Sequence, residues 1–356
     1  MIVTGGEPVG AEAYTTRAYD DDGILLWSVS HGDIVLCVAI DANNNVYTGG
    51  ISIDWQTTRK YDSSGSLLWS VDHGARVNGI AVDSAGNVYT AGERTAAIGG
   101  TTATVRKYDP LGNLMWSLDH NDPAQAYVSD AFCIAVDAGY VYVGGAPAHD
   151  VWGYGLMTYA VAIFDTDGNF QDWNAPGAPF VYGIAHVGDY HLEVGDVFTY
   201  DYPAPHDLTT RLYDPGTTYD ANHGAAVYCA ALNASGNAFV GGDSFGGVSI
   251  EKFDNTCGLL WGVDHGNTVR GIAIDALGNV YIGGLRAGDA MTTRKYDSLG
   301  APIWSVDHGN QVYALAHAET YIAPVPPIDP YGLPAPHIYV GNVKFDGVPA
   351  MPPPPS

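Results

Sequence analysis

Short runs of apolar residues alternate with clusters of Asp, Asn and Gly along almost the whole chain. The stretch from residue 79 to residue 120 shows the unit most clearly, with apolar runs at Gly79–Asp83, Val88–Gly92, Val105–Asp109 and Leu114–His120. These runs are rich in Val, Ile and Tyr and end at turn-forming residues, which is the pattern of short strands joined by tight turns. The pattern therefore predicts a unit of four strands.

Copies of this unit fill the rest of the chain. First strands are expected at Leu36–Asp41, Gly79–Asp83, Phe132–Asp137, Tyr182–Val187, Tyr228–Asn233, Gly271–Asp275 and Tyr313–His317. Fourth strands are marked by Trp27, Trp69, Trp116, Trp173, Trp261 and Trp304, and by a degenerate copy near Tyr219–His223. The sequence therefore predicts an all-β fold, a seven-bladed β-propeller of four-stranded antiparallel blades, because radial closure leaves few exposed strand edges.

The two ends of the chain predict how the ring closes. The N-terminal region supplies a second, a third and a fourth strand, beginning with Ile2–Gly6, but no first strand. The C-terminal region supplies the first strand Tyr313–His317, so we expect one mixed N- and C-terminal blade. Ile338–Asn342 also has the pattern of a second strand and competes with Ile2–Gly6 for the same place. The sequence leaves this competition open.

One propeller domain is expected at residues 1–348, followed by a Pro-rich tail at residues 349–356. The tail favours an extended polyproline conformation and is either a solvated end or a docking strip for a neighbouring subunit. Met1 is followed directly by a strand of the repeat, so we expect no signal peptide.

Loop lengths distinguish the two rims of the predicted ring. Links after the first and third strands are short and contain Gly, whereas those after the second strands vary in length. The variable links share one rim, where loops on a rigid scaffold can form a partner-specific surface. Two tryptophans lie outside the repeat register in these loops, among acidic residues, His and Tyr. The candidate ligand-binding residues are Asp54, Trp55, His149, Asp150, Trp152, Tyr154, Tyr202, His206 and Asp207. The alternative is that these loops simply pack on the rim.

A second set of candidates repeats once per unit. The histidines of this set are His31, His73, His120, His223, His265 and His308, and the tryptophans are Trp27, Trp69, Trp116, Trp261 and Trp304. Metal binding and acid–base catalysis are alternatives for the histidines, but residues spread around a ring do not converge as metal ligands must. We expect each His to bond a nearby backbone or hydroxyl group, with Thr48 and Thr90 as candidates. The tryptophans are expected to pack between blades.

The composition of the chain argues against two classes of binding partner. The chain has 356 residues, 46% of them hydrophobic, and a formal charge of −25 that comes mostly from Asp; many of these Asp residues lie at repeated turn positions. This charge repels phosphate backbones, and no apolar run approaches the ~18 residues of a membrane span. We therefore expect neither nucleic-acid binding nor membrane insertion. Cys37, Cys133 and Cys229 share a position that requires a small side chain and are expected to be buried free thiols, whereas Cys257 lies in a turn without an obvious partner.

The sequence contains no nucleophile elbow, phosphate loop, zincin helix or paired-cysteine zinc site. We therefore expect no catalytic residue, no metal and no cofactor. His186 and His317 are the acid–base candidates that lie off the repeat register. If they faced the axis, the alternative would be a cytoplasmic propeller enzyme, a polysaccharide lyase or hydrolase with an axial active site.

The repeats resemble known propeller repeats. Units of the form Gly79–Tyr89 followed by a Lys-Tyr-Asp turn and a Leu-Leu-Trp strand resemble the bacterial SBBP and NHL-like groups. The fuller signature Tyr61–Gly74 is similar to repeats of uncharacterised β-propeller proteins from tailed bacteriophages. This resemblance implies a virion component of the tail, neck or head decoration, assembled in the host cytoplasm and present in many copies. Its partners would be other virion structural proteins or a cell-surface glycan. Residues 137–230 depart from the signature, and no functional residue is carried over.

Overall fold

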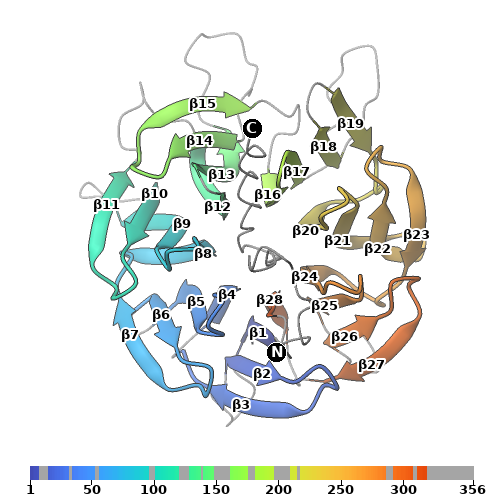
Figure 1. Ribbon diagram of the computed structural model, residues 1–356, viewed down its shortest axis with the longest axis horizontal. Helices are drawn as coiled ribbons and strands as arrows, with labels where there is room; N and C mark the ends of the chain where they lie inside the picture. The colour runs from blue at the N-terminus through green and yellow to red at the C-terminus, as the bar shows by residue number, and fades with distance from the viewer. Residues whose placement is uncertain are drawn as a thin grey trace, which may run out of the picture.

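The structure is a computed structural model that describes residues 1–7, 15–31, 34–52, 56–95, 101–119, 128–137, 139–147, 161–174, 181–195, 209–214, 217–285, 292–307 and 311–318. Within these ranges the chain forms seven four-stranded antiparallel sheets around a central axis (Figure 1). The predicted all-β, seven-bladed propeller is confirmed. In the described part of the chain, no helix has the length and apolar character of a membrane span.

Each blade runs outward from an innermost strand beside the axis. In that order, blade 1 contains β28 (Val312–His317), β1 (Ile2–Gly6), β2 (Thr16–Tyr19) and β3 (Leu25–Val29), and blade 2 contains β4 (Ile34–Ile40), β5 (Val46–Ile51), β6 (Thr58–Tyr61) and β7 (Leu67–Val71). Blade 3 contains β8 (Ala75–Val82), β9 (Val88–Thr95), β10 (Thr101–Tyr108) and β11 (Leu114–Asp119), and blade 4 contains β12 (Val128–Val136), β13 (Tyr140–Pro147), β14 (Val161–Asp165) and β15 (Phe170–Asn174).

The remaining three blades follow the same order. Blade 5 contains β16 (Val181–Val187), β17 (Tyr190–Gly195), β18 (Thr210–Asp214) and β19 (Thr217–Ala221). Blade 6 contains β20 (Val227–Leu232), β21 (Ala238–Phe245), β22 (Val248–Phe253) and β23 (Leu259–Val263), and blade 7 contains β24 (Val269–Ile274), β25 (Val280–Gly284), β26 (Thr293–Tyr296) and β27 (Pro302–Val306). The innermost strands contact one another in sequence, and β28 contacts both β24 and β4, which closes the ring.

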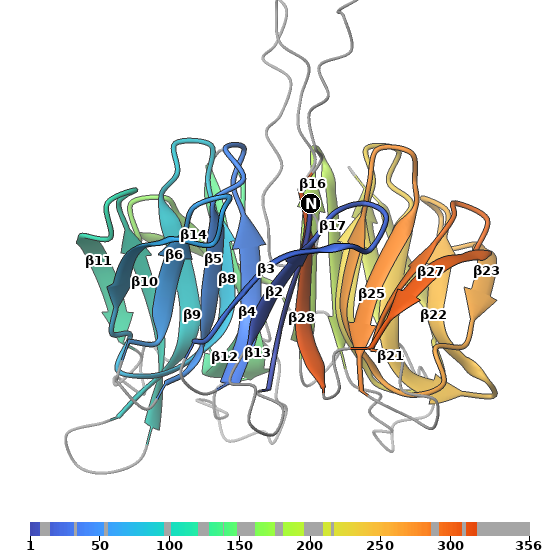
Figure 2. The same ribbon diagram turned by 90° about the horizontal axis from the view of Figure 1, so that it is seen from below.

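Blade 1 is the mixed blade that the sequence predicted. Strand β1 pairs with β28, with Ile2 opposite His317 and Val3 opposite Ala316, so the N-terminal segment fills the second place. Figure 1 shows β1 beside β28, and the side view shows the blue N-terminal strands next to the orange-red β28 (Figure 2). The competing segment Ile338–Asn342, the domain boundary after residue 348 and the Pro-rich tail lie outside the described residues.

Aspartates at the repeated turns explain much of the negative charge. In the first hairpin of blade 2, Asp41 Oδ1 accepts the backbone N–H groups of Asn43 and Asn45 at 2.9 Å, and Asp41 Oδ2 accepts the Tyr47 hydroxyl at 2.9 Å. Equivalent turn bonds form at Asp20, Asp62, Asp83, Asp109, Asp165, Asp254, Asp275 and Asp297. These carboxylates replace water as acceptors for turn N–H groups, which is why Asp recurs there.

Neighbouring blades are joined by a row of three side chains. In blade 2, Tyr47, Lys60 and Trp69 are cross-strand neighbours, and both the Lys60 ammonium (3.2 Å) and the Trp69 indole N–H (3.1 Å) donate to the Pro110 carbonyl in blade 3. The indole bonds of the other repeated tryptophans run from Trp27 to Ser63, Trp116 to Thr166, Trp261 to Ser298 and Trp304 to Asp21. The repeated tryptophans therefore lie at blade boundaries, and the last bond spans the closure of the ring.

Blades 4 and 5 depart from this row. Trp173 lies in the expected fourth strand, but Asp172 occupies the place opposite Ile163 where Trp69 stands opposite Lys60. The cause is one extra residue, because Trp69 follows Asp62 by seven positions and Trp173 follows Asp165 by eight. In blade 5 the row is Leu192, Leu212 and Tyr219, which is entirely uncharged.

The outermost strands expose apolar side chains at the circumference. Leu25, Leu67, Leu114 and Leu259 are each at least half exposed, as are the residues that follow them. These residues belong to blades 1, 2, 3 and 6, and Ile303 adds blade 7, so five consecutive blades carry them. The propeller therefore has a circumferential apolar band that stops at blades 4 and 5.

Candidate functional site

Every innermost strand contains a β-bulge at the same place. In β8, for example, Val77 pairs with Gly92 and Gly79 pairs with Ala91, so Asn78 is left out of the ladder. The residues left out in this way are Leu36, Asn78, Phe132, Tyr182, Tyr228, Arg270 and Tyr313. Bulges redirect side chains, and these seven residues all line one cavity on the axis.

The glycine that recurs opposite the bulge in the second strands is the sequence signature of these bulges. A Cβ atom added at Gly92 would lie 2.0 Å from the Arg76 carbonyl oxygen, and one added at Gly242 would lie 2.1 Å from that of Ala226. No side chain fits at such a distance from backbone atoms. The glycines of the second strand are therefore required because the bulged first strand comes so close.

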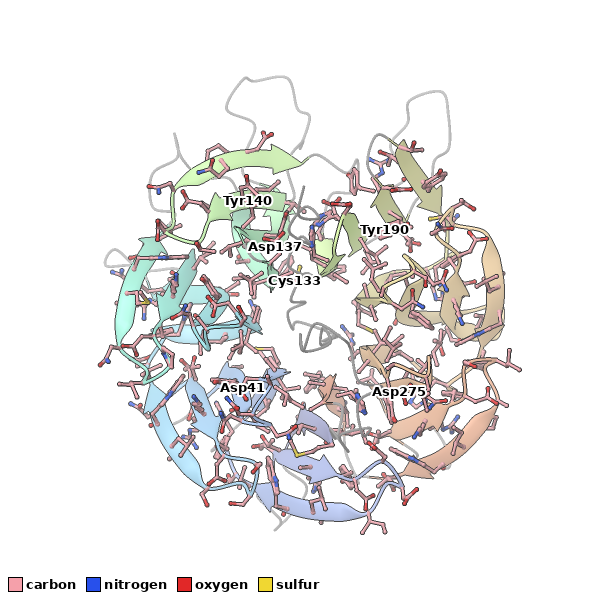
Figure 3. The ribbon with its side chains drawn as sticks, in the orientation of Figure 1. Asp41, Cys133, Asp137, Tyr140, Tyr190 and Asp275 are labelled. Carbon is pink, nitrogen blue, oxygen red and sulfur yellow. The ribbon has the colours of Figure 1, made fainter. Side chains whose placement is uncertain are left out.

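The axial cavity has a volume of about 240 Å³. Its walls come from the first halves of the innermost strands, which begin at the rim that carries the links between blades. The cavity therefore lies in the half of the axis nearer the rim that also carries the links of variable length. Cys133, which follows the bulged Phe132, marks its blade 4 side in Figure 3.

Three consecutive blades form an aromatic wall. The ring centroids of Phe132 and Tyr182 are 5.5 Å apart, and those of Tyr182 and Tyr228 are 5.4 Å apart. Arg270 continues the wall in blade 7, with its Cζ atom 3.8 Å from the Tyr228 ring centroid. Leu36 lines the cavity in blade 2, and Asn78 lines it in blade 3, where its side-chain amide donates to the Ala131 carbonyl of the neighbouring blade 4 at 2.9 Å. The cavity is thus asymmetric, although the backbone around it repeats.

Acidic residues hold the polar groups of the wall. The Tyr228 hydroxyl donates to Asp243 at 2.9 Å, the Tyr313 hydroxyl donates to Glu7 at 2.6 Å, and Arg76 forms an ion pair with Glu93. Burial and the Asp243 carboxylate raise the pKa of Tyr228 to about 12, so its hydroxyl is neutral at physiological pH. Tyr228 is therefore fixed at both its ring and its hydroxyl, which preorganises this part of the wall.

A second off-register group lies between blades 4 and 5. The Tyr142 ring stacks on His186 at 5.0 Å, and the Tyr142 hydroxyl donates to Asp137 at 3.2 Å. His191 Nε2 lies 2.9 Å from Glu193 Oε1, and this Glu residue is only 2% exposed. Figure 3 shows Asp137 and Tyr190 on the two sides of this boundary. The group includes Tyr142, which occupies the place of Tyr47 in a blade that has Ile163 and Asp172 where blade 2 has the lysine and the tryptophan.

His186 is held in its neutral form. Burial, together with the neighbouring His191 ring, lowers the pKa of His186 to about 4. The side chain is 13% exposed and faces a neighbouring blade rather than the axial cavity. His317 is similar, because its ring stacks on Tyr281 at 4.6 Å and is buried. Neither acid–base candidate from the sequence lines the axial cavity.

The repeated histidines that the structure describes are buried, and two of them contact hydroxyl groups through their rings. His31 Nδ1 lies 3.0 Å from Thr48 Oγ1, and His73 Nδ1 lies 2.9 Å from Thr90 Oγ1, which are the two contacts suggested by the sequence. In blade 6 a valine, Val240, stands where the threonine is expected, and His223 Nδ1 bonds Glu251 instead, at 2.7 Å. His31, His73 and His223 therefore bridge consecutive blades. The buried His265 departs from the expectation, because neither of its ring nitrogens has a hydrogen-bond partner among the described residues.

The remaining sequence-derived candidates cannot be placed. Outside the described residues lie His120 and His308, and also the whole ligand-binding set: Asp54, Trp55, His149, Asp150, Trp152, Tyr154, Tyr202, His206 and Asp207. All four cysteines are free, and Cys37, Cys133 and Cys229 are buried as predicted. Within the described ranges, no group of three or more His, Cys, Asp or Glu side chains is arranged to hold a metal ion.

Sequence reasoning missed the axial wall, although the sequence contains a signal for it. The residue before each Cys37-type position varies from Leu to Asn, Phe, Tyr and Arg, while its neighbours repeat. A variable position inside a constant strand indicates a side chain that the core does not constrain.

Comparisons with known proteins show the fold. No protein-family model matches the chain, and curated proteins give no match. Among solved structures, Kuenenia stuttgartiensis hydrazine synthase is similar at 10% identity and a TM-score of 0.58, over 76% of this chain and 86% of that one. Apo AztD from Citrobacter koseri matches at 11% identity and a TM-score of 0.55, over 88% and 95% of the two chains. The computationally designed Ika8 protein matches at 15% identity and a TM-score of 0.54, over 89% and 91%. At these identities the matches bear on the propeller architecture alone.

Proposed function

We propose that this protein is a non-enzymatic binding propeller that holds a cell-surface glycan in its axial cavity. The observation that carries this proposal is the aromatic wall of Phe132, Tyr182 and Tyr228, assembled from three blades at bulged positions. Nothing in blade packing requires three large rings at neighbouring axial places, since Leu36 and Asn78 occupy the same place elsewhere.

The chemistry of the wall suits a sugar. Aromatic rings supply contact area at low entropic cost, and fixed polar groups beside them supply orientation. The cavity of about 240 Å³ is slightly smaller than the ~300–1,000 Å³ of drug-sized pockets, so it fits a terminal sugar unit better than a long chain. Among the described residues, the lining contains Arg, Asn and Tyr but no Asp, Glu or His, which favours binding over acid–base chemistry.

Glycan arrays followed by calorimetric titration test this proposal. We expect the wild-type chain to bind a subset of glycans, and Tyr182→Leu to weaken that binding at least about tenfold because it removes the central ring of the wall. Tyr140→Leu is the matched control, since Tyr140 is 46% exposed and does not line the cavity. Absence of glycan binding, or equal affinity in Tyr182→Leu, contradicts the proposal.

The same proposal places the protein on a bacteriophage virion, in the tail, neck or head decoration. The similarity of the Tyr61–Gly74 signature to phage propeller repeats supports this location. The apolar band on five consecutive blades supports contact with other virion proteins, because exposed apolar patches commonly mark interfaces. Immunogold electron microscopy of particles is the test. Labelling at one fixed place on the particle is the expected result, and label confined to unattached protein contradicts it.

A further inference from the structure

Arg270 is held differently from the arginines of this acidic protein that pair with carboxylates. Arg76, Arg94 and Arg211 form ion pairs with carboxylates within their own blades. The Arg270 guanidinium instead stacks on Tyr228, and within the described part of the chain no hydrogen bond or ion pair involves it. Its Nε atom is buried and has no acceptor there. A chain with a formal charge of −25 thus presents to its axial cavity a guanidinium that has no carboxylate partner among the described residues.

The neighbouring residues hold the Arg270 side chain in place without accepting hydrogen bonds from its guanidinium N–H groups. It occupies a bulge of β24 between Val269 and Gly271, and its partner ring is held by the Asp243 carboxylate through the Tyr228 hydroxyl. Stacking engages the face of a guanidinium and leaves its N–H groups free in the plane. These donors form a rigid fork that matches a carboxylate through two parallel hydrogen bonds.

The acidic residues nearby are already engaged. Glu93 pairs with Arg76, Glu7 accepts from Tyr313, and Asp243 accepts from Tyr228 and from the Thr268 hydroxyl at 2.6 Å. None of these carboxylates lines the cavity, whereas Arg270 does. An anionic group that enters the cavity therefore contacts the positively charged Arg270 directly. The three carboxylates lie behind the side chains with which they are bonded, so they do not contact the anion.

We propose that the ligand of the axial cavity is an acidic sugar, and that Arg270 selects it by pairing with its carboxylate. This assignment rests on the proposed glycan binding and adds the class of sugar to it. In the bound state the sugar ring lies against Phe132 and Tyr182, and the carboxylate of a hexuronic acid extends to Arg270 in blade 7. Only non-covalent contacts are involved.

The test is calorimetric titration of the full chain with two oligosaccharides, one ending in glucuronic acid and the other its carboxyl-reduced counterpart ending in glucose. We expect the acidic form to bind about 10- to 100-fold more tightly, which is the range for hydrogen bonds to charged groups. Arg270→Gln should remove this preference and keep the affinity for the neutral form. Arg211→Gln, which breaks an ion pair away from the cavity, is the matched control and should keep the preference.

The outcomes separate the two proposals. Equal affinity of the wild type for both sugars, or an unchanged preference in Arg270→Gln, overturns the role of Arg270 but leaves glycan binding in place. Absence of binding to either sugar, while a glycan array identifies another ligand that Tyr182→Leu weakens, overturns only the acidic-sugar assignment. Absence of binding to every glycan overturns both. Far-UV circular dichroism of each variant verifies that the propeller has formed.

Discussion

The contact between Trp69 and Gly112 offers a direct test of how the blades are joined. Gly112 lies in the turn of blade 3 that faces Trp69, and it has a φ of +87°. A Cβ atom there would lie 3.0 Å from Trp69 Cδ2 and 3.2 Å from Cγ. The indole cannot move away freely, because its N–H donates to Pro110 at 3.1 Å. Gly112→Ala should therefore strain the backbone and also separate the two blades.

Gly86→Ala is a matched control in the same blade. Gly86 has a φ of +81°, but the closest atom to its added Cβ would be Pro110 Cγ at 3.5 Å, an ordinary contact. Both alanines carry the cost of a left-handed residue, about 1–2 kcal/mol. Only Gly112→Ala adds overpacking against a large ring, about 1–3 kcal/mol. We therefore expect the free energy of unfolding to be lower in Gly112→Ala than in Gly86→Ala by about 1–3 kcal/mol.

Urea denaturation followed by far-UV circular dichroism measures this difference as a shift in midpoint at constant slope. A double-mutant cycle with Trp69→Phe isolates the contact, since the smaller ring should recover part of the loss. Equal destabilisation by the two alanines would show that the indole does not pack on this turn, and the account of the blade boundary would be wrong.

Two further predictions concern the buried histidines. Burial lowers the pKa of His73 to about 3 and that of His265 to about 4. In the unfolded chain the pKa of both side chains is near 6.5, so on acidification these histidines bind protons in the unfolded state before they do so in the folded state. Stability should be full above pH 6.5 and fall as the pH decreases toward 4, at up to about 1.4 kcal/mol per pH unit for each histidine. Melting temperatures between pH 7.5 and 4.5 measure this, and an unchanged slope in His73→Gln contradicts it. Glu251→Ala removes the acceptor of the buried His223 ring and should cost about 1–3 kcal/mol, more than Glu251→Gln, which keeps an acceptor. Equal losses in urea denaturation would refute a role for that bond.

The fold could be predicted from the sequence because its determinants are local and repeated. Turn aspartates such as Asp41 and Asp83 bond the residues two and four positions ahead, so each hairpin carries its own signal. The buried positions of Cys37 and Cys133 followed from their alignment with glycines in other units. Trp173 shows the limit of this reasoning, because counting tryptophans does not detect the single extra residue that moves it off the repeat.

The axial wall could not be predicted in the same way, because its geometry depends on seven strands that meet only in the closed ring. Phe132 and Tyr182 are 50 positions apart in sequence, and their contact depends on the bulges of β12 and β16 facing the same axis. Strand alternation alone assigns a residue to one of two sheet faces. A bulged residue can point its side chain in a third direction, toward the axis, and the periodic sequence pattern does not show this direction.

Because bulged side chains point toward the axis, the residues available for binding differ from the residues that pack the blades. Residues on the two faces of each blade, such as Ile80 and Ala81, are buried and must match the next blade in size. A bulged residue such as Asn78 or Arg270 faces the cavity, so its identity can change without loss of that packing. Selection for a ligand can therefore act on seven axial positions almost independently of selection for the fold. In this chain the variable axial positions include the aromatic wall and Arg270. The tests of function therefore address these residues rather than the repeated histidines and tryptophans.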